Sequence, residues 1–186
     1  MPEQTSPEAA ALRRRQDEFG WDGVDRLAYK QDAAAPFRDV SRQTLFSRPD
    51  LAGELRYFEI AAGGHTTLER HNHVHGVMVL RGRGRCLVGT RVDDIGELDL
   101  VTIPGWTWHQ FRAAADAPLG FLCLVDSARD RPALPTPDDI ASLRAHPEVA
   151  AFLDGYSIGP KSGIHFSVRC DNKAIDHRDR VRLDAQ

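Results

Sequence analysis

In the stretch Glu69-Arg70-His71-Asn72-His73-Val74-His75, three of the chain's eight histidines stand at alternate positions. Imidazole is the commonest metal ligand in proteins, and three imidazoles on one extended segment are costly to bury for packing alone. A fourth histidine, His109, follows the turn-forming pair Pro104-Gly105. We interpret the four histidines as a site for one divalent metal ion inside a small β-barrel, in preference to a histidine patch on the surface.

Length and charge restrict the class of protein. The chain of 186 residues, 41% of them apolar, has the size of one ordinary domain with modest extensions. Its net charge of -3 and the lack of a basic stripe argue against nucleic acid as a partner. No apolar run approaches the roughly 20 residues that span a bilayer, so we expect no membrane partner.

The cysteines and the first residues bear on the compartment. Cys86, Cys123 and Cys170 stand at no zinc-finger spacing, and an odd, sparse set of this kind is typical of free thiols in a reducing cytoplasm. Residues 1–5 hold no basic segment followed by an apolar stretch, so no secretion signal is visible. We therefore expect a cytoplasmic protein.

The order of turn and cap signals predicts three parts: an N-terminal extension (1–52), a barrel (53–127) and a C-terminal helix with a tail (128–186). Ser6 and Pro7 favour a helix that ends at Gly20, and the segment up to residue 50 reads as loop-rich. Short strands at 8–12 residue spacing indicate an antiparallel sandwich or barrel. The expected strands are 55–60, 76–80, 86–88, 100–103 and 119–125, with a turn at 81–84.

Helix signals return after the barrel. Thr136 is a good N-cap, Pro137 suits the first helical position, and the helix should reach about Arg144. A further short helical piece should extend through Phe152. The charged tail from Lys161 is expected to be irregular, or ordered only against a partner.

Two spacings together resemble the motifs of the cupin family. Gly63-(five residues)-Glu69-x-His71-(three residues)-His75-(six residues)-Gly82 has the spacing of the first cupin motif, and Pro104-Gly105-(three residues)-His109 that of the second. The resemblance covers about residues 55–126. It implies an all-β antiparallel jelly-roll barrel with a metal inside, to which the cap signals add short N- and C-terminal helices.

The ligand set has two versions, because the chain departs from the family pattern. Without a gap, Glu69 stands where the first histidine is expected; with a gap, His71 and His73 form the usual pair. Both versions use His71, His75 and His109, and the fourth ligand stays open between Glu69 and His73. Residues four apart on a strand lie about 13 Å apart, so the chain must bend between His71 and His75.

Such a ligand set suits manganese, iron, nickel, copper or zinc, and the sequence does not choose among them. Three or four protein ligands leave a coordination position open for water or substrate, which metal catalysis requires.

Four further residues are candidates for the pocket. Cys123 is either a small buried hydrophobe or a catalytic thiol that faces the metal. Trp106 and Phe111, beside His109, are either core residues or a wall of the substrate pocket. Arg56 is either a solvated edge charge or a bidentate anion ligand at the barrel mouth.

Members of the family that this chain resembles include dioxygenases, decarboxylases, isomerases, lyases and a methylsulfurylase that acts on a thio-sugar phosphate. We therefore expect a metal-dependent enzyme that acts on a small anionic or oxygenated metabolite. The alternative is a non-catalytic sensor or binding module. Exposed edges in a small barrel predict a homodimer.

Overall fold

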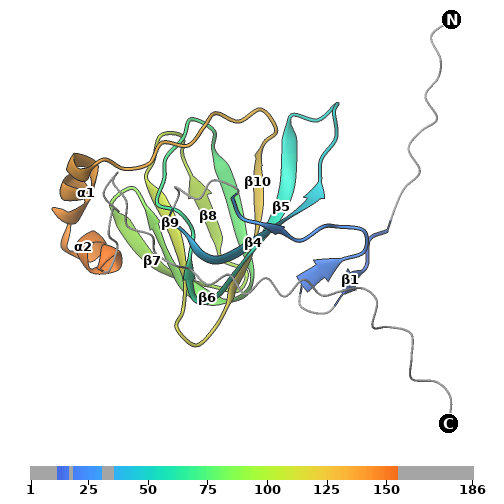
Figure 1. Cartoon of the computed structure of the whole chain (residues 1–186), viewed down its shortest axis with the longest axis horizontal. Helices are drawn as coiled ribbons and strands as arrows, with labels where there is room; N and C mark the ends of the chain where they lie inside the picture. The colour runs from blue at the N-terminus through green and yellow to red at the C-terminus, as the bar shows by residue number, and fades with distance from the viewer. Residues whose placement is uncertain (1–11, 17–18, 31–35, 155–186) are drawn as a thin grey trace, which may run out of the picture. The chain divides into compact units, whose positions relative to one another are not determined.

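The computed structural model describes residues 12–16, 19–30 and 36–154. Within these residues it has ten strands and two helices (Figure 1). The strands are β1 (Arg15–Gln16), β2 (Gly20–Trp21), β3 (Leu27–Ala28), β4 (Arg38–Phe46), β5 (Gly53–His65), β6 (His75–Val88), β7 (Arg91–Gly96), β8 (Leu100–Ile103), β9 (His109–Ala113) and β10 (Leu119–Asp126), and the helices are α1 (Pro137–Arg144) and α2 (Pro147–Leu153). Strands β3 to β10 form one antiparallel sheet, which closes because β10 pairs with β5 as well as β6. The predicted all-β jelly-roll barrel, with short helices after it, is confirmed.

Alternate residues of the central strands face the barrel interior. Because side chains on a strand point to opposite faces in turn, one face of each strand is apolar. On β5 and β10 the rings of Phe58 and Phe121 stack with centroids 5.4 Å apart, and Phe111 of β9 packs on Phe121 at 4.7 Å. This core lies beside the histidine site and holds in place the strands that carry the site.

The prediction of an N-terminal helix from Pro7 to Gly20 is wrong for the part of this segment that the structure describes. Its start lies outside the described residues, but Arg15–Gln16 and Gly20–Trp21 pair as antiparallel strands. The ring of Trp21 packs edge-on against Tyr57 on the outside of the barrel, with centroids 5.1 Å apart. Burial of this aromatic side chain in an extended segment outweighs a weak helical pattern.

Strand β4 lies in the segment that the sequence indicated as loop-rich. It pairs with β5 over nearly its whole length, and Val40 reaches the core. The expectation failed because the other inward positions of β4, Arg42 and Thr44, are polar, so the hydropathy of this segment does not alternate.

The turn expected at residues 81–84 is also absent, because β6 runs through them without a break. Gly82 has φ +73°, and a Cβ there would lie 1.9 Å from the carbonyl oxygen of Pro118. A Cβ on Gly84 would lie 2.1 Å from the carbonyl oxygen of Arg112. These glycines allow close approach of neighbouring strands and do not end the strand.

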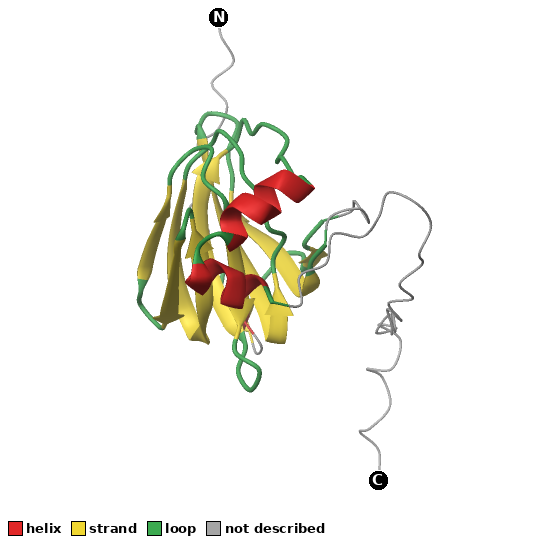
Figure 2. Cartoon of the chain, turned by 90° about the vertical axis from the view of Figure 1, so that its left-hand side faces the viewer, coloured by secondary structure: helices red, strands yellow, loops and turns green. Residues whose placement is uncertain are grey.

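The C-terminal helices follow the cap signals. Thr136 and Asp139 form a reciprocal capping box at the start of α1, with Pro137 in the first turn, as predicted. Helix α2 contacts β7, and the two helices lie against the outside of the barrel (Figure 2). The guanidinium of Arg112 lies 4.6 Å from the ring centroid of Phe152, which ties α2 to β9.

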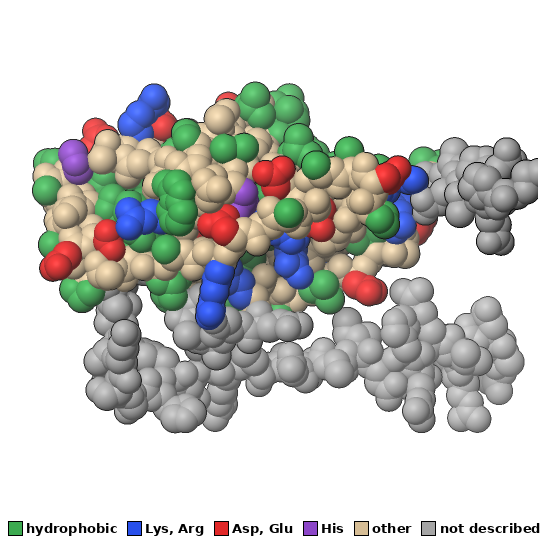
Figure 3. Space-filling model, turned by 90° about the horizontal axis from the view of Figure 1, so that it is seen from above, with side chains coloured by type: hydrophobic (Ala, Val, Ile, Leu, Met, Phe, Trp, Pro, Cys, Tyr) green, Lys and Arg blue, Asp and Glu red, His purple; other side chains and the backbone are tan. Residues whose placement is uncertain are grey.

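Charged side chains of both signs are interspersed over the face shown in Figure 3. A helix long and apolar enough to cross a bilayer is absent from the described residues.

We predict that Gly82→Ala destabilises the barrel, because the new Cβ would be strained by the positive φ and would collide with the backbone of Pro118. The free energy of unfolding should fall by at least about 2 kcal/mol in chemical denaturation. Gly96→Ala is the control, since a Cβ there meets nothing within 4 Å. Equal stabilities of the two variants would contradict the close approach described for Gly82.

Candidate metal and thiol site

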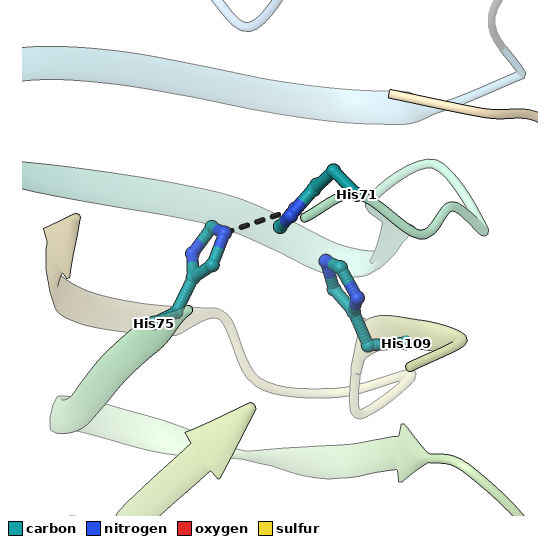
Figure 4. A group of neighbouring side chains, drawn as sticks. All are labelled: His71, His75 and His109. Carbon is teal, nitrogen blue, oxygen red and sulfur yellow. Dashed lines mark hydrogen bonds between the residues drawn. The ribbon is translucent and has the colours of Figure 1, made fainter. Parts of the chain in front are cut away.

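Three histidines from separate parts of the barrel converge inside it (Figure 4). His71 comes from the segment between β5 and β6, His75 begins β6, and His109 begins β9. The Nε2 atoms of His71 and His75 are 3.0 Å apart, and one ring nitrogen from each of the three lies within 4.8 Å of the others. The structure thus brings together the three histidines that both versions of the ligand set share.

Backbone carbonyl groups fix the protons of two of these rings. Nδ1 of His71 lies 2.9 Å from the carbonyl oxygen of His73, and Nδ1 of His109 lies 2.9 Å from that of Thr107. A carbonyl oxygen only accepts hydrogen bonds, so each Nδ1 carries the proton and donates it. The Nε2 of both rings is left with a lone pair, as in metal-binding histidines whose other nitrogen is held by a backbone group.

Burial keeps the three imidazoles neutral. Burial, followed by the charges of neighbouring histidines, lowers the pKa of His71 to about 4 and lowers that of His75 further. Burial also lowers the pKa of His109. Neutral imidazoles with converging lone pairs are the donor set that transition metals bind, so these residues fit a divalent metal ion.

The bend between His71 and His75 is confirmed, and groups distant in the sequence hold it. The Asp130 carboxylate accepts the backbone N–H of Asn72 at 2.8 Å. The backbone N–H of Trp106 donates to the carbonyl oxygen of His71 at 2.6 Å. Anchors on both sides allow the chain to leave the strand conformation and return to it within four residues.

His73 lies beside the three histidines but is held differently. Its ring stacks on that of His71, with centroids 3.6 Å apart and planes 3° apart, and its Nδ1 lies 2.6 Å from an oxygen of Asp130. His71, His73 and Asp130 form a second group whose ligand atoms lie within 4.8 Å of one another.

Glu69, the other candidate for fourth ligand, is buried against two residues from the N-terminal part of the chain. Its carboxylate forms an ion pair with Lys30 and accepts a hydrogen bond from the Tyr29 hydroxyl at 3.3 Å. Burial and the nearby Glu69 carboxylate raise the pKa of Tyr29 well above its ordinary value. An ion pair with Lys30 balances the charge of Glu69 without a metal.

Cys123 lies next to the histidines. Its Sγ is 3.0 Å from Nδ1 of His75, and its side chain is 2% exposed. Burial raises the pKa of the Cys123 thiol to about 12, although the charges of Arg56 and Arg129 act to lower it. Cys123 is therefore both a core residue and a partner of a candidate metal ligand.

The other two cysteines are elsewhere. Cys86 is buried in the same apolar core, and burial raises its pKa to about 11. Cys170 lies outside the described residues.

The two aromatic candidates for the pocket, Trp106 and Phe111, differ in their exposure to solvent. Trp106 is 58% exposed on the turn before β9, whereas Phe111 is 4% exposed within the core. Neither contacts the histidine rings in a described aromatic pair, so their part in a substrate pocket stays a prediction. Arg56 faces the interior opposite Cys123 in the strand register.

The sequence reasoning missed Tyr29, Lys30 and Asp130. Each reaches the site from a segment about 40 or more positions from its partner along the chain. Tyr29 and Lys30 lie in the segment that the sequence indicates as loop-rich, and Asp130 follows the last strand. No spacing or periodicity connects them to the histidines, so the sequence contains no signal that identifies them.

Comparisons with known proteins agree with this geometry. The family model described as "Cupin domain" matches residues 56–125. The 1-methylthio-D-xylulose 5-phosphate methylsulfurylase of Rhodospirillum rubrum is 62% identical over 144 residues, which cover 77% of this chain and 92% of that protein.

Solved structures give the same result. A cupin 2 conserved barrel domain protein from Rhodopseudomonas palustris has 57% identity and a TM-score of 0.72, with coverage of 76% of this chain and 98% of that one. A cupin-2 domain from Rhodospirillum rubrum has 61% identity and a TM-score of 0.71, with coverage of 77% and 97%.

We predict that the purified protein carries about one transition-metal ion per chain. His71→Ala, His75→Ala and His109→Ala should each bring the metal content close to zero, because each removes one of three converging lone pairs. Elemental analysis of the folded variants measures this. His146→Ala is the control, since His146 is exposed at the start of α2. Unchanged metal content in all three site variants would refute the assignment.

The same measurement distinguishes the two candidates for the fourth ligand. If Glu69 binds the metal, Glu69→Gln should weaken metal binding and His73→Ala should not. The reverse result would identify His73 as the ligand. Equal, near-normal metal content in both variants would indicate a site of three histidines.

Proposed function

The chain belongs to the cupin family, and from that premise we propose that it is a metal-dependent methylsulfurylase that acts on a 1-methylthio ketose phosphate. The observation that carries the proposal is the 3.0 Å contact between Cys123 Sγ and Nδ1 of His75. The contact brings a thiol next to a candidate metal ligand, and the methylsulfurylase that is 62% identical to this chain supports the choice of reaction.

The proposed reaction transfers the methylthio group from carbon 1 of the substrate to the sulfur of Cys123. The Cys123 thiolate attacks the sulfur at carbon 1 of the substrate, a sulfur–sulfur bond forms, and the carbon–sulfur bond breaks. The electron pair passes to carbon 1 and is delocalised over the neighbouring ketone. Protonation of carbon 1 then gives the 1-deoxy ketose phosphate and leaves Cys123 as a methyl disulfide.

A second thiol must complete the cycle. A small thiol attacks the methyl disulfide, takes the methylthio group as a mixed disulfide and returns the Cys123 thiolate. The small thiol is therefore a co-substrate, and turnover without it should stop after one equivalent.

His71, His75 and His109, with Glu69 or His73 as a fourth ligand, would hold the metal, which is manganese, iron, nickel, copper or zinc. A bound ion would supply Lewis-acid chemistry that polarises the substrate carbonyl. If Nε2 of His75 held the metal, the remaining proton of the ring would stand on Nδ1 and would be donated toward Sγ of Cys123. This hydrogen bond favours the thiolate and offsets part of the cost of burial.

We place the protein in the cytoplasm, where a buried free thiol such as Cys123 stays reduced.

We predict that Cys123→Ser abolishes turnover of 1-methylthio-D-xylulose 5-phosphate in the presence of dithiothreitol. Metal content should stay normal, and stability should fall by only about 1 kcal/mol, because a serine hydroxyl does not replace thiolate nucleophilicity. The assay follows the 1-deoxy ketose phosphate per folded, metal-loaded molecule.

Cys86→Ser is the matched control, because Cys86 is equally buried in the same core. It should lose a similar amount of stability and keep its turnover. Full turnover in Cys123→Ser would refute the sulfur-transfer mechanism. Binding of the substrate without any turnover in the metal-loaded wild type would favour the alternative of a non-catalytic sensor.

We further propose a homodimer through the outer face of β6, β8 and β10. Met78, Leu100 and Leu124 are exposed there, and Met78 pairs with Leu100 in the strand register. Multi-angle light scattering should give twice the chain mass, and Leu100→Glu should shift the protein toward monomer, because burial of a charge in an apolar interface is unfavourable. A wild type that is monomeric at all concentrations would contradict the proposal.

A further inference from the structure

Polar side chains line part of the inner face beside Cys123. In the strand register Arg56 of β5 lies between Cys123 of β10 and Thr44 of β4. Arg42 of β4 pairs with Phe58, whose ring belongs to the core. Since residues two apart on a strand share a face, Arg42 and Arg56 point into the same interior as Cys123.

One carboxylate joins two of the arginines of this region. Oε2 of Glu54 accepts from Nε of Arg56 and from Nη1 of Arg129, each at 2.8 Å. The side chains of Arg56, Glu54 and Arg129 are 11%, 15% and 26% exposed, so the group lies near the open end of the barrel. Glu54 also pairs with Val125, one same-face step along β10 from Cys123, which is about 6.7 Å.

Arg42 has an unsatisfied donor. Its Nε is buried and has no hydrogen-bond partner among the described residues. A buried guanidinium N–H without an acceptor is destabilising, more so than an unsatisfied neutral donor. The donor is therefore suited to an acceptor that arrives with a ligand.

The charges of the cluster do not balance. The positive charges of Arg42 and Arg129 both act on Arg56, and the three arginines together outnumber the carboxylate of Glu54 by two. A phosphate monoester carries a charge of about -1.5 to -2 at neutral pH and offers three acceptor oxygens. Guanidinium groups bind such an anion through paired hydrogen bonds.

We infer that Arg42, Arg56 and Arg129 form a binding site for the terminal phosphate group of the substrate. The inference rests on the proposed function, which it deepens by locating the end of the substrate away from the reacting sulfur. Cys123 would meet the methylthio end, and the guanidinium groups of Arg42, Arg56 and Arg129, which border the same inner face, would hold the phosphate. Arg42 and Arg129, which no motif indicates, become residues that select phosphorylated ketoses over free ones.

Calorimetry with the metal-loaded, full-length protein tests the site without turnover. The probes are D-xylulose 5-phosphate and D-xylulose, which lack the methylthio group and differ only in the phosphate. Arg42→Met and Arg129→Met should each weaken binding of D-xylulose 5-phosphate by at least about tenfold and leave that of D-xylulose unchanged. Arg42→Lys keeps the charge without Nε, and its affinity should fall between those of wild type and Arg42→Met.

Arg83→Met is the matched control, because Arg83 is 60% exposed and pairs with Asp116 on the surface. It should bind both probes as the wild type does. Wild-type affinity for D-xylulose 5-phosphate in the variants of Arg42 and Arg129 would overturn the inference, and so would an equal loss for both probes. These binding results are independent of the Cys123→Ser experiment. Full turnover in that variant would refute the sulfur transfer and would not change the result on phosphate binding.

Discussion

Three imidazole rings whose nitrogens converge inside an apolar barrel are the constraint on which the rest of the site depends. The Nδ1 atoms of His71 and His109 donate their protons to carbonyl groups. In the neutral rings the Nε2 atoms of these two histidines therefore act as acceptors. His75 alone can adapt. If its Nε2 donates to His71, then its Nδ1 must accept the thiol proton of Cys123; if its Nε2 is a metal ligand, its Nδ1 becomes the donor. A bound metal and the thiol would therefore be coupled through the position of one proton on His75.

This constraint also explains why the ligand segment is held so firmly. A metal site formed by two histidines four residues apart loses its geometry if the bend between them relaxes. Asp130 holds one side of the bend and the backbone N–H of Trp106 the other. The backbone hydrogen bonds from Asn72 and His73 and the hydrogen bond to the His73 ring lower the pKa of Asp130, so its carboxylate stays charged over the physiological range. The anchor is therefore insensitive to pH where the enzyme operates.

The sequence predicted the barrel, the C-terminal helices and the three converging histidines because each has a local signal: alternation, a capping box or a spacing. It did not predict β4, since Arg42 and Thr44 are polar residues on an inward face and hide the alternation. It predicted a helix near residue 15 because propensity is local, whereas the packing of Trp21 on Tyr57 is not. The partners of Glu69 and His73 come from residues 29–30 and 130, and only the closed barrel brings them near.

The inward polar residues that obscured β4 are the same residues that make the interior chemically useful. Along β5 the inner face changes from Ile60 and Phe58, which are core residues, to Arg56 and Glu54 near the open end. Cys123 lies opposite Arg56, where the apolar and charged parts of the interior meet. Burial in the apolar part raises the pKa of the Cys123 thiol, whereas the charges of Arg56 and Arg129 oppose that effect. A thiol at this boundary is protonated at neutral pH, and in the proposed reaction a bound metal and the His75 Nδ1 proton would favour its thiolate.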